Sequence, residues 1–192
     1  MDAKAQEVLD FWFADATEYR KEWFTKDEDF DDKIRAKFSE DLELAIQGKY
    51  DDWADTAEGR IALIVLLDQF SRNLFRGSPK SWSQDPKALE LTLEGIKKGH
   101  DRELNQVQRF FFYMPLEHSE DFEIQKLSIA KFEELVEDYP APDSIARNGL
   151  DYAQRHYDII ERFGRYPHRN DVLGRESTPE EVEFLKQPNS SF

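Results

Sequence analysis

Residues 61–77 read IALIVLLDQFSRNLFRG, and this stretch decides the fold. Its first half is apolar on every side of a helix, which is typical of a helix at the centre of a protein. Its second half is polar on one side only. Successive helical residues are about 100° apart, so the polar residues share an arc of about 140°. These residues are Asp68, Gln69, Arg72, Asn73 and Arg76. The sequence therefore predicts a central helix over residues 58–76 with acid, amide and guanidinium groups on one face.

The rest of the chain also has helical periodicity. Seven further helices are predicted, over residues 3–13, 27–47, 85–99, 101–115, 119–139, 143–163 and 180–186. Asp85, Ser119 and Asp143 are expected to cap the helices that begin at them, and Pro115 is expected to end the helix that contains it. Thr178 begins a capping-box pattern, with proline at the first helical position after it.

No segment alternates apolar and polar residues over a strand's length, so no sheet is expected. No linker and no low-complexity tract divides the chain, and the apolar and aromatic residues suffice for one large core. The predicted fold class is therefore all-α, a single-domain array of about eight helices over residues 1–192.

Composition argues against several classes of protein. The formal net charge of −15 disfavours non-specific binding to nucleic acid, because an acidic surface repels phosphates. The absence of cysteine rules out disulfides and thiolate chemistry and fits a reducing compartment. The N-terminus has acidic residues where a signal peptide has basic ones, and the longest apolar run is too short to cross a membrane. These features predict a soluble, cytoplasmic protein without a membrane or nucleic-acid partner, and they leave its oligomeric state open.

The second polar segment is PLEHSED, residues 115–121. Its acids suit the N-terminus of a helix, where they complement the helix dipole. His118 could instead act as a general base held by a carboxylate, or bind a metal ion with Glu117, Glu120 or Asp121. The spacing does not match a compact metal motif, so no metal site is predicted. Capping is the favoured interpretation for the acids, and His118 is kept as a candidate functional residue.

The third segment, residues 163–175, is a loop rich in basic residues in an otherwise acidic protein. Its notable side chains are Arg165, His168, Arg169, Asn170 and Arg175. Ordered loops on a helical scaffold commonly carry binding groups, although a basic strap on an acidic body has the same composition. His156, on the preceding helix, is interpreted as a structural residue.

Long stretches of the chain resemble one bacterial family. They are LLDQFSRNLFRGSPKSWSQD (66–85), YMPLEHSED (113–121), RFGRYPHRNDVLGRESTPEEVEFL (162–185), VLDFWF (8–13) and EWFTKDEDFDDKIRAKF (22–38). Together they resemble the family catalogued as domain of unknown function 924. The resemblance implies an all-helical, tetratricopeptide-like fold, and it implies no activity.

Three hypotheses about function follow. The first is a binding domain for an anionic small molecule or a carboxylate-bearing peptide, because arginine suits carboxylate and phosphate. Its predicted site comprises Asp68, Gln69, Arg72, Asn73, Arg76, His118, Glu120, Arg165, His168, Arg169 and Asn170. The second is a hydrolase or phosphoryl-transfer-like enzyme, with His118 or His168 as general base and arginines that stabilise negative charge. The third is a structural network in which the three segments interlock.

The sequence identifies no cofactor. It contains no phosphate-binding loop, no dinucleotide-binding glycine pattern, no nucleophile elbow and no zinc signature. The candidate site therefore depends on the clustering of polar residues and not on a known catalytic motif.

Overall fold

The computed structural model describes residues 1–14 and 20–191, and these residues form helices, turns and loops without a strand. The all-α prediction is thus confirmed for the described chain. The α-helices are α1 (Ala3–Trp12), α2 (Glu28–Ile46), α3 (Ala57–Ile64), α4 (Ser71–Leu74), α5 (Asp85–Lys98), α6 (Gln106–Glu117), α7 (Phe122–Asp138), α8 (Ile145–Phe163) and α9 (Pro179–Phe184). The short helical segments are η1 (Lys21–Trp23), η2 (Asp51–Asp55), η3 (Val65–Phe70), η4 (Pro79–Ser81), η5 (His100–Glu103) and η6 (Pro167–Arg169).

The predicted central helix is confirmed as α3, η3 and α4, which follow one another without a break. The Thr56 side chain begins it by accepting a hydrogen bond from the backbone N–H of Gly59. Residues 61–67 are almost fully buried, as expected for a helix that is apolar all round. Segment η3 is π-helical. Such wide turns are rare and occur often at functional sites.

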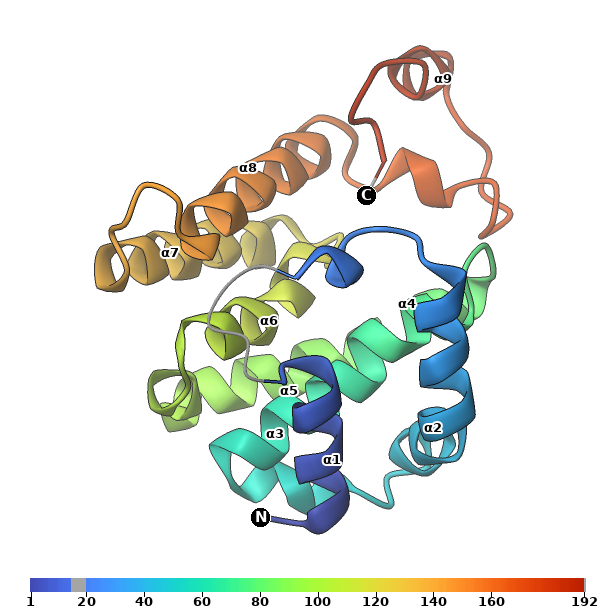
Figure 1. Cartoon of the computed structure of the whole chain (residues 1–192). Coiled ribbons are helices and arrows are strands. Elements are labelled where there is room, and N and C mark those ends of the chain that lie inside the picture. Colours follow the sequence, from blue (N-terminus) through green and yellow to red (C-terminus); the bar gives the residue numbers. More distant parts are fainter. Residues whose placement is uncertain (15–19, 192) are drawn as a thin grey trace.

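The other helices form two groups around this centre (Figure 1). In the first group, α1, α2 and α5 pack against the central helix. In the second group, α7 and α8 lie side by side, and both contact α6. One large apolar cluster joins buried side chains from α1 to α8. A separate small cluster of Ile159, Ile160 and Tyr166, with Phe163 and Phe184 against it, anchors the C-terminal segment to the end of α8.

The prediction that Pro115 ends its helix is wrong. Helix α6 begins at Gln106, after its Asn105 cap, and continues through Pro115 to Glu117. A proline removes the N–H that would bond the carbonyl four residues earlier, here that of Phe111, and its ring crowds that carbonyl. These effects weaken α6 at one point without ending it. The two residues beyond Pro115 make Glu117 helical and make His118 the C-terminal cap.

Three predicted caps are also wrong, and in each case a neighbouring residue takes the position. Gln84 precedes α5, and the Asp85 side chain is turned to an arginine of α4 instead. Asp121, not Ser119, caps α7 by accepting from two backbone N–H groups. Ser144, not Asp143, precedes α8. The capping box of Thr178 and Glu181 at α9 is confirmed.

Among the helices that the structure describes, none has both the length and the apolar character required to cross a bilayer. The tetratricopeptide-like arrangement implied by the resemblance stays a prediction.

The close approach of α6, α7 and α8 gives a test of the packing. A Cβ on Gly149 would lie 2.4 Å from a ring carbon of Phe132 and 2.9 Å from one of Phe110. We expect Gly149→Ala to lower the free energy of unfolding by about 1–3 kcal/mol through overpacking, as measured by urea denaturation. Gln154→Ala, at an exposed position of the same helix, is the control. Equal stability of the two variants would contradict this packing.

Candidate functional site

A cavity of about 850 Å³ lies where the C-terminal end of the central helix meets α6, α8 and the loop around η6. Three helix stripes form half of its wall. The stripe on the central helix is Gln69, Arg72, Asn73 and Arg76; the stripe on α6 is Phe110, Met114 and Glu117; and the stripe on α8 is Ile145, Asn148, Tyr152, Arg155 and His156. The spacings of three and four residues are those of single helix faces. Side chains from η1, η4 and the loop around η6 complete the wall.

The lining is unusual for so acidic a chain. It includes four arginines and three of the four histidines, and one acidic residue among the described side chains. The arginines are Arg72, Arg76, Arg155 and Arg169; the histidines are His118, His156 and His168; and the acid is Glu117. Basic side chains are thus concentrated at this cavity.

The carboxylate of Asp68 lies behind the wall and organises it. Asp68 is fully buried on η3, the π-helical segment. Its Oδ1 lies 2.7 Å from His118 Nδ1 and 2.9 Å from Arg72 Nη1, and its Oδ2 accepts from the Gln69 amide. Burial alone would raise the pKa of Asp68, but Arg72 and His118 lower it to about 2. The group is therefore ionised at neutral pH.

Two arginines meet at a second carboxylate, that of Asp85 at the start of α5. Arg72 donates to both of its oxygens, at 2.9 and 3.0 Å, and Arg169 Nη1 lies 3.4 Å from Oδ2. Arg72 therefore connects Asp68 with Asp85, whereas Arg169 has only one long contact there. The Arg169 Nε is buried without a partner among the described residues. Its guanidinium lies 4.6 Å from the Tyr166 ring and 5.3 Å from the Trp82 ring.

The three histidines of the pocket are held in the neutral form. Burial lowers the pKa of His118, and the charge of Arg72 adds to this effect against the opposing charge of Asp68. Burial likewise lowers the pKa of His156 to about 3 and that of His168 to about 4. Because a carboxylate accepts hydrogen bonds, His118 carries its proton on Nδ1, and Nε2 keeps a lone pair that can accept a proton.

The pKa of Glu117 shifts in the opposite direction to the pKa values of the histidines. It is 2% exposed, and burial together with the charge of Asp68 raises its pKa well above the ordinary value. The pocket thus places a carboxyl group whose protonated form is favoured beside a histidine whose neutral form is favoured.

The family model described as bacterial protein of unknown function (DUF924) matches residues 8–189. The chain belongs to this family. A solved structure of the protein of unknown function ATU0120 from Agrobacterium tumefaciens is similar, with 38% sequence identity and a TM-score of 0.84. The similarity covers 96% of this chain and 97% of that one. No curated protein matches the chain.

In this DUF924 protein, the structure brings seven of the predicted site residues to the cavity wall, and Asp68 lies directly behind it. The seven are Gln69, Arg72, Asn73, Arg76, His118, His168 and Arg169. The i,i+4 ion pair of Asp68 and Arg72 that the helix spacing allows is formed. Two of the seven also bind Asp31 on α2, which fixes the end of the central helix: Asn73 donates at 2.7 Å and Arg76 at 2.6 Å.

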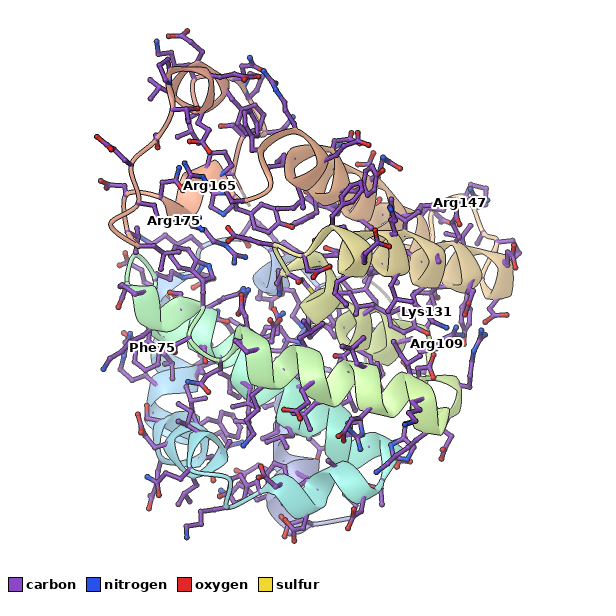
Figure 2. The ribbon with its side chains drawn as sticks, turned by 180° about the vertical axis from the view of Figure 1, so that it is seen from behind. Phe75, Arg109, Lys131, Arg147, Arg165 and Arg175 are labelled. Atoms are coloured by element: carbon purple, nitrogen blue, oxygen red, sulfur yellow. The ribbon has the colours of Figure 1, made fainter. Side chains whose placement is uncertain are left out.

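Three predicted site residues are not at this wall. Arg165 pairs with the buried Glu181 at 2.7 Å, and the Asn170 amide donates to the same carboxylate. Glu120 pairs with Arg175 at 2.7 Å. Figure 2 shows Arg165 and Arg175 together in the C-terminal segment, on the opposite side of the molecule from Arg147. These contacts fasten the segment to α9 and to the start of α7, as the structural hypothesis expects of a basic strap.

Sequence reasoning considered Glu117 only as an alternative metal ligand beside His118, and it interpreted His156 as structural. The expected helix break at Pro115 left Glu117 outside the helix, whose continuation puts it on one face with Met114, three residues earlier. His156 was judged structural, yet it lines the cavity with Tyr152 and Arg155. The amphipathic pattern of α8 did not show that some of its polar side chains line a cavity.

Two of the three acids considered as alternative metal ligands beside His118 are engaged elsewhere. Glu120 binds Arg175 and Asp121 caps α7. Within residues 1–14 and 20–191, no three His, Asp or Glu side chains are placed to hold one metal ion.

Proposed function

We propose that the pocket of this DUF924 protein binds an anionic small molecule with an apolar part. The observation that carries the proposal is the lining itself, with four arginines against one buried acid whose pKa is raised, in a chain of net charge −15. Guanidinium groups bind carboxylate and phosphate well. The volume of about 850 Å³ lies within the range of about 300–1,000 Å³ usual for small-molecule sites.

The lining has a polar end and an apolar end. The polar end contains the side chains described above around Arg72, Arg169 and His118. At the apolar end, the ring of Phe24 lies 6.4 Å from that of Trp23 and 5.9 Å from that of Phe110. Such a division suits a ligand with a charged head and an aromatic or aliphatic body.

Arg169 is the strongest candidate for contact with the anion. It is 7% exposed, its Nε has no partner among the described residues, and its contact with Asp85 is long. Stacking against Tyr166 holds the guanidinium in place. An incoming anion would supply the hydrogen-bond acceptors that this buried group lacks.

Binding can be measured by isothermal titration calorimetry with 3-phenylpropionate, benzenesulfonate and phenyl phosphate, which share one ring and differ in the anion. We expect at least one of them to bind, and Arg169→Ala to weaken it by about 10- to 100-fold through loss of charge-assisted hydrogen bonds. Arg147→Ala, at an exposed arginine bound to the backbone carbonyls of Pro140 and Ala141, is the charge-matched control. The neutral 3-phenylpropionamide should not bind. If no anion binds, or if Arg169→Ala has no effect while the fold is intact, the proposal fails.

One contact favours a second candidate function, the hydrolysis of an anionic ester. The Asp68 carboxylate holds His118 Nδ1 at 2.7 Å, which leaves Nε2 as the basic nitrogen. A carboxylate that orients a histidine in this way is a common feature of general-base catalysis. Arginines beside it would stabilise the negative charge that develops on the attacked group.

The second candidate is tested with mono-p-nitrophenyl succinate. His118→Asn should lower the rate of nitrophenolate release by about 10²- to 10⁴-fold, since it removes the base. Arg147→Ala should retain the rate. A wild-type rate no greater than that of buffer would exclude hydrolysis of this ester and leave the binding proposal standing.

A further inference from the structure

The carboxyl group of Glu117 lacks the partner that a buried carboxylate needs. Its Oε1 is buried and makes no hydrogen bond within the described part of the chain. Its Oε2 lies 3.7 Å from Nδ1 of His156, but that nitrogen lies 2.8 Å from the carbonyl oxygen of Tyr152 and must donate its proton there. A buried polar group left without a partner destabilises the fold, so its retention at a cavity wall calls for an explanation.

A neutral carboxyl group explains these contacts better than an ionised one. An ionised carboxylate at this depth would need an adjacent cation, and no Lys or Arg of the described chain forms an ion pair with Glu117. The protonated form instead offers one O–H donor to whatever occupies the cavity.

The charges at the polar end cancel before a ligand arrives. The guanidinium charges of Arg72 and Arg169 face the carboxylates of Asp68 and Asp85. The other two arginines of the lining are paired as well, Arg76 with Asp31 and Arg155 with Asp151. A neutral site accommodates one added negative charge with less repulsion than two. This balance favours a carboxylate over a phosphate dianion.

Glu117 and Arg169 both line the cavity, and a series of ring contacts connects them. The Arg169 guanidinium lies 4.6 Å from the Tyr166 ring, that ring lies 5.6 Å from the His156 ring, and His156 Nδ1 lies 3.7 Å from Glu117 Oε2. A ligand in the cavity is therefore bordered by both a guanidinium group and the Glu117 carboxyl group.

We propose that Glu117 is a hydrogen-bond donor to the ligand, and that the ligand is a monoanionic carboxylate with an aromatic or aliphatic body. This inference rests on the proposed anion-binding function and specifies the chemical class of the ligand. The protonated Glu117 carboxyl group donates a hydrogen bond to the ligand carboxylate, while Arg169 supplies the positive charge.

Affinity for the ligand should depend on pH through Glu117. The groups that face Glu117 are Asp68 from η3, His118 from α6, His156 from α8 and Tyr166 from the loop before η6. Above pH 6.5 the histidines are neutral because their pKa values are lowered, Asp68 is ionised because its pKa is about 2, and the pKa of Tyr166 is raised by burial. Glu117 is then the member of this group that titrates. Its ionisation removes the donor and adds a repelling charge, so affinity must fall as pH rises through its pKa.

The test is the dissociation constant of 3-phenylpropionate between about pH 6.5 and about pH 9, where the ligand itself stays ionised. The wild-type Kd should rise by up to about tenfold per pH unit above the pKa of Glu117. Glu117→Gln keeps an N–H donor and cannot ionise, so its Kd should not follow this rise. Glu123→Gln, which removes an exposed carboxylate at the start of α7, should behave as wild type. The infrared band of a protonated carboxyl group should be present in the wild type at neutral pH and absent in Glu117→Gln.

Each outcome decides between the proposals. Failure of all three phenyl anions to bind contradicts the proposed function. Binding of 3-phenylpropionate with the same pH profile in the wild type and Glu117→Gln, or without the protonated-carboxyl band, overturns only this inference. Tighter binding of phenyl phosphate than of 3-phenylpropionate at about pH 8 overturns it as well, because the phosphate is then a dianion.

Discussion

The buried carboxylate of Asp68 is the constraint on which the site depends. A charge with no exposure to water is tolerated only with close opposite charge and hydrogen bonds, and removal of one partner from such a pair typically costs about 3–5 kcal/mol. Arg72 and His118 are those partners. Because His118 ends α6 and Arg72 also binds Asp85 at the start of α5, the pairing brings three parts of the chain together. The cavity opens where these parts meet.

The same pairing gives the pocket both structural and binding roles. Arg72 donates hydrogen bonds to two carboxylates and is chiefly structural, whereas Arg169 has a buried Nε without a partner among the described residues. From the sequence, a structural network and a ligand site were alternative interpretations of the same residues. In the folded protein the two are neighbours, because Asp68 lies behind the cavity wall and Arg169 forms part of that wall. The hydrogen bonds of Arg165 and Asn170 to Glu181 lie outside the cavity and hold the C-terminal segment in place.

How far the sequence predicted this arrangement depends on the range of each interaction. The central helix and its polar arc follow from residues 61–77 alone, since burial and helix periodicity are local properties. The prediction that Asp85 caps α5 was wrong because Arg72, which is distant in sequence, binds the Asp85 carboxylate. The local pattern also did not predict that α6 continues through Pro115, and the place of Glu117 on the same helix face as Met114 was therefore not anticipated. Arg165 could not be separated from Arg169 by composition, because which carboxylate each arginine meets is decided by tertiary packing.

The most direct test of the central interaction is nitrogen NMR of the His118 side chain at neutral pH. A histidine held by the ionised Asp68 should be neutral, with the proton on Nδ1 and none on Nε2. Asp68→Asn should disturb this state, and Glu123→Gln should leave it unchanged. An imidazolium, a mixture of tautomers or a proton on Nε2 in the wild-type protein would contradict the role assigned to Asp68.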